Sequence, residues 1–431
     1  MGSPHRDDHG LPLAPWNPPA SAGSGTHFAM LRIRVTAVAA VTAAALVGAT
    51  STTQAASPEL TAALAQALVA QDIDPRQTAA LAIDIQTGKV VFRENSTIAL
   101  MPASAEKLAV SFAALRLLGP GFRFRSEIVA SGELDGKVWN GDLVLIGFGD
   151  PTFGLKDIDA LARDVAAWGI RRVSGRVLGD ERHFDTRRDA PGWKPSYLGI
   201  ESRPLSALSV DEVEFRGANG SAAAAAGALT AALERRGVSV DGSPQAGRAP
   251  GDGFPLALDL SDPLVAIVRQ MNRESDNFVA EMLLKELGAS VARRGTSPAG
   301  GRVVRAALAD AGVEIGGVRI ADGSGLSLRD RLTAVALVDI LRAGARDPSI
   351  RDAFVTSLSI AGISGTLQKR LERRPTRGRV IAKTGTTSAA SALAGFIRRR
   401  YVFAVIQNGS PVPYWSARAA QDRFVTVLAR S

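Results

Sequence analysis

The amino-acid sequence predicts an α/β (α+β) protein, in which helices pack on an antiparallel sheet and a second, mixed α/β domain is inserted into the chain. Residues 79–92 have the pattern of a β-hairpin and residues 380–407 that of antiparallel strands, so the two regions are expected in one sheet. Helical periodicity dominates residues 263–357, whereas short strands and helices alternate in between. The outer domain is predicted at residues 57–121 and 256–431, and the insertion at residues 122–255.

The first 56 residues are expected to lie outside these domains. Residues 1–29 are rich in Gly, Pro, His and Ser without periodicity, which is typical of a disordered or mis-started segment. From Met30, two arginines precede an apolar run at 35–47 and then small residues, a pattern that predicts a signal peptide over 30–56. An uncleaved anchor is the alternative, although the run is shorter than the roughly 20 residues that span a bilayer. We therefore expect an exported protein.

The first folded part contains a serine and a lysine at the start of a helix. An apolar stripe from Pro102 to Leu118 predicts this helix, and Gly119 with the following proline ends it. Ser104 and Lys107 are three residues apart and can share one face. A serine needs a base within hydrogen-bond reach to act as a nucleophile, and a partly desolvated lysine can be that base. Taken alone, a capped helix with a solvated lysine is the simpler interpretation. A short helix from Pro58 to Leu68 is predicted ahead of the hairpin.

The inserted part begins with two predicted strands, 122–130 and 138–146. Its Gly147-x-Gly149 segment lacks the third glycine of a dinucleotide fingerprint, so no such cofactor is predicted, nor any other. Ordered loops are expected over 185–213, and a Gly/Pro-rich linker at 241–255. Further elements are a helix at 157–168, a strand at 172–178 and a helix at 222–236.

Two tripeptides in the last part accompany secondary-structure boundaries. Ser275-Asp276-Asn277 stands just before a predicted helix, and Lys383-Thr384-Gly385, followed by Thr386, stands just before a run of strand character. Each tripeptide is common by chance: Ser275 could be a helix cap, Asn277 a turn residue and Lys383 a solvated strand end. Helices are predicted at 263–272, 278–287, 299–311, 334–343, 349–357 and 415–429, a tight loop at 322–327, and strands at 380–383, 392–398 and 402–407.

Composition excludes several classes of function. The 431 residues are 46% hydrophobic, enough for two or three packed domains, and the absence of cysteine excludes disulfides and thiol enzymes. The net charge of +9 would attract anionic partners. Nucleic acid is not expected as a partner, because the arginines are scattered in short runs and an exported protein meets few nucleic acids. At most, peripheral association with an acidic membrane surface is expected.

Histidine content argues against two other hydrolase chemistries. Of the four histidines, His183 alone follows residue 55, and no Gly-x-Ser-x-Gly segment occurs, so a Ser-His-Asp triad is a poor alternative. One histidine without cysteine cannot assemble a usual zinc site, so no metal is predicted. His183 itself is expected at a surface or an interface.

The three motifs in this order, around Ser104, Ser275 and Lys383, resemble those of penicillin-recognising serine enzymes. With these motifs and several further short segments, the chain resembles the class C low-molecular-mass penicillin-binding proteins. These are the serine D-alanyl-D-alanine carboxypeptidases and endopeptidases of the penicillin-binding protein 4 type. The resemblance implies a transpeptidase/β-lactamase-like domain, with helices on both sides of its antiparallel sheet and an accessory insertion after the first motif. The number of inserted subdomains stays open. The further marks are residues 149–151, 190–193, 204–209, 322–327 and 365–367.

The resemblance also implies roles for individual residues. Ser104 would attack the carbonyl between two D-alanines and Lys107 would take its proton, while the N–H groups of Ser104 and Thr386 hold the oxyanion. Ser275 would relay a proton to the leaving amine, helped by Lys107 or Lys383. The expected catalytic residues are Ser104, Lys107, Ser275, Asn277 and Lys383. The groups expected to bind the substrate are Asn277, Lys383, Thr384, Gly385 and Thr386, where Gly385 would leave the strand edge free for substrate.

Two further residues are predicted in the inserted part. Asp180 and Phe184 are candidates for contact with a diamino-acid side chain, although a turn carboxylate and a core aromatic are the simpler interpretations. Arg182-His183-Phe184 stands where many relatives carry a serine before the phenylalanine, which leaves substrate contacts there open. The inserted part as a whole is expected to wall the substrate site and bind the peptide stem.

The implied partners are peptidoglycan stem peptides, with β-lactam antibiotics as covalent inhibitors, in the periplasmic or other extracytoplasmic cell-wall space. A β-lactamase of the same fold and a catalytically silent cell-wall binding module are the alternatives. The Glu-x-x-Leu-Asn segment that class A β-lactamases use for deacylation is missing, because Glu281 continues a helix. A long-lived penicilloyl ester is therefore expected.

Overall fold

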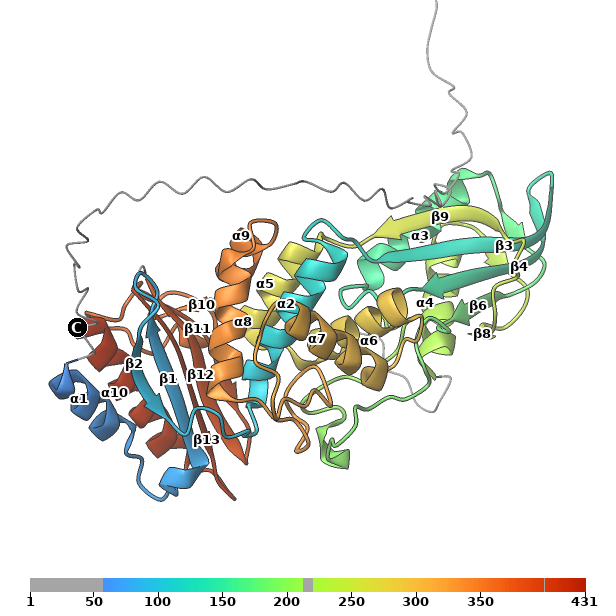
Figure 1. Ribbon diagram of the computed structural model, residues 1–431. Coiled ribbons are helices and arrows are strands. Elements are labelled where there is room, and N and C mark those ends of the chain that lie inside the picture. The colour runs from blue at the N-terminus through green and yellow to red at the C-terminus, as the bar shows by residue number, and fades with distance from the viewer. Residues whose placement is uncertain (1–56, 212–219, 399) are drawn as a thin grey trace, which may run out of the picture. The chain divides into compact units, whose positions relative to one another are not determined.

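The computed structural model of the protein describes residues 57–211, 220–398 and 400–431. The expectations for residues 1–56 lie outside this described part. A six-stranded antiparallel sheet has the order β10-β11-β12-β13-β1-β2 (Figure 1). Its first and last sequence segments meet where β1 pairs with β13, as predicted. The strands are β1 (Thr78–Asp84), β2 (Val90–Glu94), β10 (Ser359–Ile360), β11 (Val380–Thr386), β12 (Ala390–Ile397) and β13 (Tyr401–Asn408).

Helices cover both faces of this sheet, which confirms the predicted fold class. Every residue of β12 and β13 is buried, because alternate side chains pack into two different cores. Ala394 and Ala404 belong to the core on one face, whereas Leu393 and Phe403 belong to the core on the other. The first face is covered by α2 (Lys107–Leu118) and α8 (Ala334–Arg346), and the second by α1 (Pro58–Leu68) and α10 (Tyr414–Arg430).

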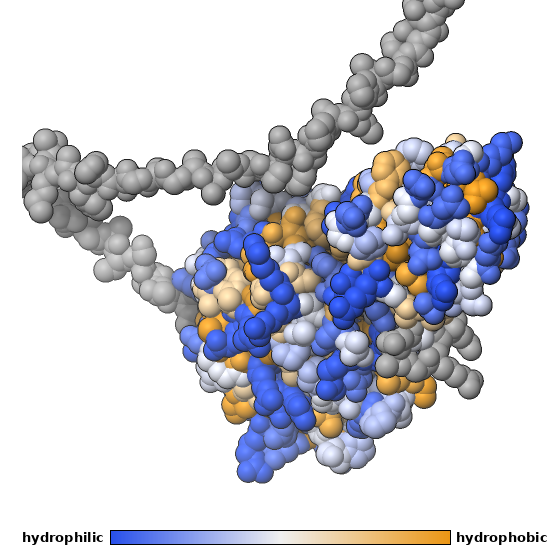
Figure 2. Space-filling model, turned by 90° about the vertical axis from the view of Figure 1, so that its right-hand side faces the viewer, coloured by the Kyte–Doolittle hydropathy of each residue, from blue (hydrophilic) through white to orange (hydrophobic). Residues whose placement is uncertain are grey.

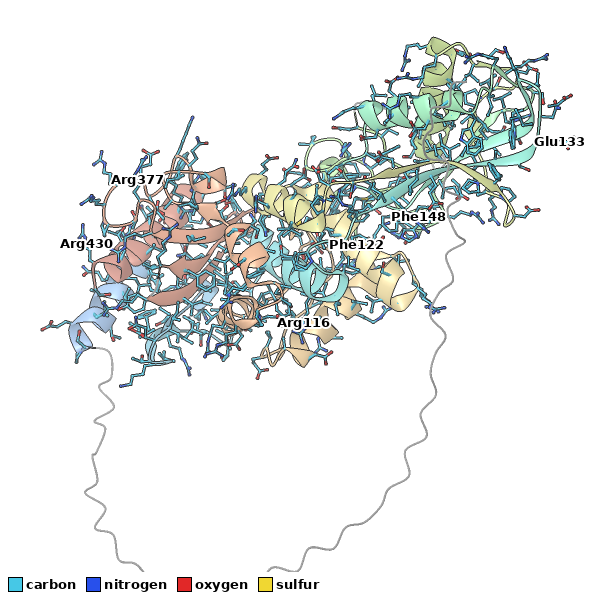
Figure 3. The ribbon with its side chains drawn as sticks, turned by 90° about the horizontal axis from the view of Figure 1, so that it is seen from above. Arg116, Phe122, Glu133, Phe148, Arg377 and Arg430 are labelled. Carbon is cyan, nitrogen blue, oxygen red and sulfur yellow. The ribbon has the colours of Figure 1, made fainter. Side chains whose placement is uncertain are left out.

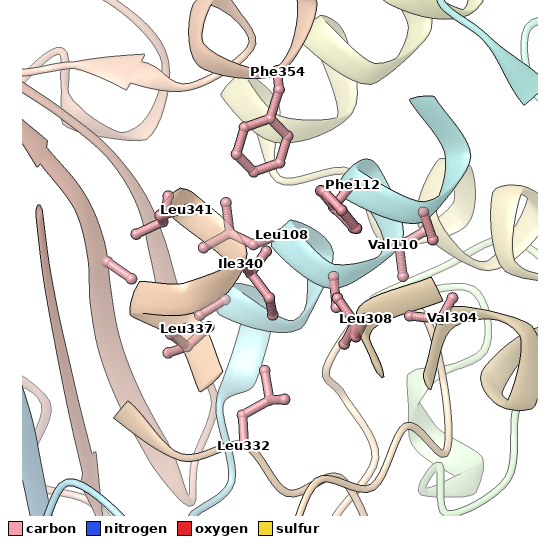
Figure 4. Packing of buried hydrophobic residues seen from close by; sticks show 14 of the residues in the cluster. Leu108, Val110, Phe112, Val304, Leu308, Leu332, Leu337, Ile340, Leu341 and Phe354 are labelled. Carbon is pink, nitrogen blue, oxygen red and sulfur yellow. The ribbon is translucent and has the colours of Figure 1, made fainter. Parts of the chain in front are cut away.

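Helix α2 lies at the centre of the larger core. Its residues from Lys107 to Leu115 are all buried, so it has no polar face, as expected of a helix surrounded by other elements. Phe112 meets Phe354 edge to face with ring centroids 6.4 Å apart, and Leu308 packs nearby (Figure 4). The surrounding helices are α5 (Leu264–Glu274), α6 (Asn277–Ala292), α7 (Ser297–Asp310) and α9 (Arg351–Thr356).

A second, seven-stranded sheet is built from the inserted part, with both parallel and antiparallel pairs. Helices α3 (Leu155–Ala167) and α4 (Gly220–Arg235) pack on this second sheet through a separate core.

Figure 2 shows hydrophilic and hydrophobic side chains interspersed over the visible face of the molecule. The strands are β3 (Arg125–Asp135), β4 (Val138–Gly147), β5 (Arg172–Val173), β6 (Val177–Asp180), β7 (Ser239–Val240), β8 (Gln245–Ala246) and β9 (Phe254–Leu260).

Two sequence expectations for the inserted part are wrong in detail. The strand expected at 172–178 is two short strands, β5 and β6, which pair with different stretches of β4. The expected linker at 241–255 contains β8 and the start of β9, and β9 pairs with β3 up to Leu260. Pro255 is tolerated there because the register shifts beside it, as at a β-bulge. The domain boundaries at 121/122 and 255/256 stay predictions.

The segment expected as ordered loops, as far as Asp211, contains a short 3-10 turn at Pro195–Tyr197 and an isolated bridge between Leu198 and Ser202. In the described ranges, none of the helices combines the length and apolarity that a bilayer crossing requires.

Candidate active site

Ser104 and Lys107 come together at the start of α2. Ser104 lies in a 3-10 turn, Ala103–Glu106, and the α-helix begins at Lys107. Lys107 Nζ donates a hydrogen bond to Ser104 Oγ over 3.0 Å. Ala103 has φ +47°, in the left-handed region that costs a non-glycine residue about 1–3 kcal/mol. The packing around this turn therefore holds the serine in a conformation that local preference disfavours.

The Lys107 ammonium is fully buried, and polar atoms satisfy it. Besides Ser104, its Nζ donates to Asn277 Oδ1 at 2.8 Å and to the Ser324 carbonyl at 2.7 Å, so all three donors are used. Burial lowers the Lys107 pKa to about 8, although Asp322 and other nearby carboxylates oppose this shift. A lysine with this pKa can exist as the neutral amine that a general base must be.

The second motif forms the junction between two helices. Ser275 ends α5 with φ +63°, and Asp276 caps α6 by accepting a 2.9 Å hydrogen bond from Val279 N–H. This sharp junction aims the Ser275 hydroxyl at β11, where it accepts a 2.8 Å hydrogen bond from Lys383 Nζ. Asn277 lies between Lys107 and the inserted part, because its Nδ2 donates to the Glu201 carbonyl.

The third motif lies on β11. Lys383 is fully buried and also donates to the Thr384 carbonyl at 2.9 Å. Burial, with a smaller effect from the charge of Lys107, lowers the Lys383 pKa well below its usual value. A cationic Lys383 would therefore need a compensating anion. Thr384 Oγ1 donates to Thr366 Oγ1 at 2.8 Å, which links the strand to the segment 365–367.

Close packing requires a glycine at position 385, and the sequence alone does not reveal this requirement. A Cβ on Gly385 would lie 2.7 Å from the Pro102 carbonyl oxygen and 3.1 Å from the Ser104 nitrogen. The missing side chain thus lets β11 approach the Ser104 turn. Strand β10 pairs only with Ile381 and Ala382, so among the described strands the edge of β11 from Lys383 to Thr386 has no partner.

Three buried carboxyl groups, those of Glu106, Glu281 and Asp322, form a cluster behind Lys107. None of them is among the candidate site residues predicted from the sequence. Glu281 Oε1 accepts 2.9 Å hydrogen bonds from the Gly323 and Ser324 N–H groups. Asp322 accepts from Gly325 N–H at 2.7 Å and from Trp193 Nε1 at 2.8 Å. These contacts hold the loop 322–327, and with it the Ser324 carbonyl that binds Lys107.

Two members of this cluster carry unpaired oxygens. Among the described residues, neither Glu106 oxygen nor Glu281 Oε2 has a hydrogen-bond partner. Burial raises the Glu281 pKa to about 8, helped by the charge of Asp322, and burial also raises the Glu106 pKa well above its usual value. Burial therefore favours the protonated form of both acids. In the sequence the loop 322–327 stands out only as a family mark, and no local pattern connects it to Glu281.

The structure places Asp180 and Phe184 inside the inserted part. Arg182 donates to both Asp180 carboxylate oxygens, at 2.6 to 3.0 Å, and Ala249 N–H donates at 2.9 Å. Phe184 is buried against Phe278 and Met282 of α6. These contacts agree with the simpler interpretations, a turn carboxylate and a core aromatic, while contact with a diamino-acid side chain stays a prediction.

Several contacts tie the inserted part to α6 and to the site. His183 Nε2 lies 2.7 Å from Glu286 Oε2, and Lys285 Nζ lies 2.5 Å from Asp185 Oδ1. Closer to Lys107, the Trp193 contact with Asp322 and the Glu201 contact with Asn277 bring the irregular segment 190–202 beside the motifs. Among the described residues, no cluster of three His, Cys, Asp or Glu side chains could hold a metal ion.

Comparison with known proteins agrees with this arrangement. The model of the D-Ala-D-Ala carboxypeptidase 3 (S13) family matches residues 60–217 and 204–431. A D-alanyl-D-alanine carboxypeptidase of an Actinomadura species is 30% identical over 80% of either chain. The carboxypeptidase DacB of Mycolicibacterium smegmatis is 32% identical over 80% of this chain and 78% of its own. Among solved structures, penicillin binding protein 4 (dacB) of Haemophilus influenzae has a similar fold, with a TM-score of 0.76 and 22% identity over 86% of this chain and 98% of its own.

Proposed function

Because this chain belongs to the D-Ala-D-Ala carboxypeptidase 3 (S13) family, we propose that it cleaves the D-Ala-D-Ala bond of peptidoglycan stem peptides through an acyl-enzyme on Ser104. It is a serine D,D-peptidase of the penicillin-binding protein 4 type. The observation that carries the proposed site is the 3.0 Å hydrogen bond between Ser104 Oγ and a buried lysine of lowered pKa. In this arrangement the hydroxyl has its base beside it before substrate binds.

Acylation would begin when neutral Lys107 takes the Ser104 proton. Ser104 Oγ then attacks the carbonyl of the penultimate D-alanine, and the N–H groups of Ser104 and Thr386 stabilise the oxyanion. Ser275 passes a proton to the leaving amine and is resupplied from Lys383, to which it is hydrogen bonded. The proton that Lys107 took from Ser104 replaces the one that Lys383 gave up, so Lys107 is neutral again and is the base when water hydrolyses the ester.

Recognition of the terminal carboxylate would use Lys383 and the hydroxyls of Thr384 and Thr386. The buried site disfavours a charge on Lys383. An arriving carboxylate supplies the opposite charge and favours the protonated lysine. Binding of the substrate carboxylate and protonation of Lys383 are therefore coupled in this proposal. The unpaired edge of β11 from Lys383 to Thr386 is available for the peptide backbone.

We place the enzyme outside the cytoplasm, with stem peptides as carboxypeptidase substrates, crosslinks as endopeptidase substrates, and β-lactams as covalent inhibitors. The signal-like pattern at residues 30–56 supports export. The named carboxypeptidase relatives support the substrate class. Contacts of Trp193 and Glu201 with the site support a role of the inserted part in walling the substrate.

Penicillin labelling followed by mass mapping tests this proposal. We expect one stable adduct per chain on the peptide that contains Ser104, together with release of D-alanine from muropeptide pentapeptides by the untreated enzyme. Rapid catalytic loss of penicillin without D-alanine release would instead identify a β-lactamase. The absence of both the penicillin adduct and the release of D-alanine would identify a silent binding module.

A further inference from the structure

A groove of about 630 Å³ lies along the outer side of α10, away from the motifs. One wall is α10 itself, and the other is the segment 369–376 that precedes β11. Because α10 and α2 cover opposite faces of the six-stranded sheet, the sheet separates this groove from the Ser104 turn. The lining includes Lys369, Arg370, Arg373, Arg374, Arg418 and Arg430, with Glu372 and Asp422 as its carboxylates and Trp415 as its tryptophan.

The groove carries an excess of positive charge that the protein does not neutralise. Of the basic residues that line the groove, only Arg370 forms an ion pair within the described part of the chain; its partner is Asp422, at 2.7 Å. Arg377, which does not line the groove, lies at the same end of the molecule as the lining residue Arg430 (Figure 3). Cations that outnumber the carboxylates beside them repel one another and concentrate anions from solution.

The basic segment is held in place by buried contacts. The Arg370 side chain is nearly buried and donates to Asp422, to Gln421 Oε1 at 2.8 Å and to the Arg418 carbonyl at 3.3 Å. Thr376 Oγ1 donates back to the Leu371 and Arg373 carbonyls. The arginines at 373 and 374 are therefore presented on a fixed turn against α10.

An exposed aromatic residue distinguishes this surface from a simple basic patch. Trp415 is 78% exposed, and Tyr414 lies against it with ring centroids 4.9 Å apart. The Arg418 guanidinium lies 4.9 Å from the Tyr414 ring centroid and 6.0 Å from that of Trp415. Tryptophan and tyrosine beside arginines are typical of groups that enter the headgroup region of a bilayer.

We propose that this groove and Trp415 form a docking surface for an anionic phospholipid membrane. Arginines bind the phosphates and Trp415 enters the headgroup layer, a combination that a phosphate polymer alone would not require. Since the motifs lie on the other face of the sheet, docking holds the enzyme at the membrane and leaves the Ser104 region accessible to peptidoglycan.

Vesicle binding tests the docking surface. The described residues from 57 onward belong to one compact unit, so protein that starts at Gln54 excludes the apolar run at 35–47 as a second source of binding. Vesicles of phosphatidylcholine with phosphatidylglycerol are compared with phosphatidylcholine alone. The variant is Arg373→Glu/Arg374→Glu. Its matched control is Arg302→Glu/Arg305→Glu, which reverses two exposed charges on α7.

We expect binding to anionic vesicles only, weakened at least about tenfold in the groove variant and by far less in the control, because a basic residue near the surface contributes about 1 kcal/mol. Added salt should weaken wild-type binding. On vesicle binding the tryptophan emission should shift to shorter wavelength, and Trp415→Ala should remove this shift. D,D-peptidase activity on a soluble peptide should be unchanged in every variant.

Three outcomes would overturn the proposal. Equal losses in the groove and control variants would mean that net charge alone attracts the vesicles. Binding of inorganic polyphosphate without binding of vesicles would mean that the groove takes a soluble phosphate polymer. A wavelength shift that persists in Trp415→Ala would mean that another surface meets the membrane.

Discussion

Glu281 and Lys107 are joined through a single residue, Ser324. The Glu281 carboxyl group accepts the Ser324 N–H at 2.9 Å, and the Ser324 carbonyl accepts from Lys107 Nζ at 2.7 Å. The Glu281 carboxyl group thus holds the residue whose carbonyl binds the lysine, while Asp322 accepts the Gly325 N–H of the same peptide unit as that carbonyl. Glu281 would act as a positioning residue, one step removed from the reacting atoms.

We expect Glu281→Gln to flatten the pH dependence of stability. Glu281 has its pKa raised from 4.5 to about 8, so between these values the folded protein binds a proton that the unfolded chain has lost. Its contribution to the free energy of unfolding is full below pH 4.5 and falls as pH rises to about 8, by up to ~1.4 kcal/mol per pH unit. Glutamine keeps the acceptor oxygen but cannot ionise.

Thermal or denaturant unfolding of wild type, Glu281→Gln and the exposed control Glu274→Gln between pH 5 and pH 8 measures this difference. The Asp150 carboxyl, whose pKa burial raises to about 6, stays the same in all three proteins and cancels. Parallel pH profiles for wild type and Glu281→Gln would show that the Glu281 carboxyl does not hold this proton.

Penicillin acylation should rise with pH through about 8, the Lys107 pKa. The base must be neutral, and the neutral fraction of a lysine grows as pH approaches its pKa from below. Lys107→Ala should lower the acylation rate by about 10²–10⁴-fold, since it also removes the hydrogen bond to Ser104. Stopped-flow labelling measures both effects. A loss below tenfold would mean that another group is the base.

Ser104→Ala should abolish covalent labelling by fluorescent penicillin and leave the thermal transition near that of wild type. The Lys107 ammonium would keep its bonds to Asn277 and Ser324, so no buried charge is left without partners. Ser290→Ala on α6 is a control of equal size and should label normally. Labelling that persists in Ser104→Ala would disprove the proposed nucleophile.

Asp180→Ala should reduce turnover of peptides with a diamino-acid side chain while penicillin acylation stays unchanged. The expected reason is a lost contact with the substrate amine, for which penicillin has no counterpart. The matched control is Asp241→Ala, which removes a similar bidentate ion pair with Arg172 at the surface of the same inserted part. Equal loss of both reactions in Asp180→Ala would show that the Asp180–Arg182 pair only maintains structure.

Local patterns in the sequence determined much of this protein. The alternation in 79–92 and 380–407 predicted strands that do pair in one sheet, and the apolar stripe after Ser104 predicted α2. The motif at Ser275 stands where a helix begins, as predicted, whereas the motif at Lys383 lies within β11 and not ahead of a strand. Periodicity, caps and turn residues act over a few positions, so the chain itself reveals them.

The tertiary structure decided what depends on contacts between distant segments. Pairing of β9 with β3 turned an apparent linker into a strand, because the partner edge, and not the local composition, supplies the hydrogen bonds. Gly385 is required by the approach of the Ser104 turn. The lowered pKa of Lys107 and the raised pKa of Glu281 follow from burial, and burial is a property of the packed molecule that no short stretch of sequence specifies.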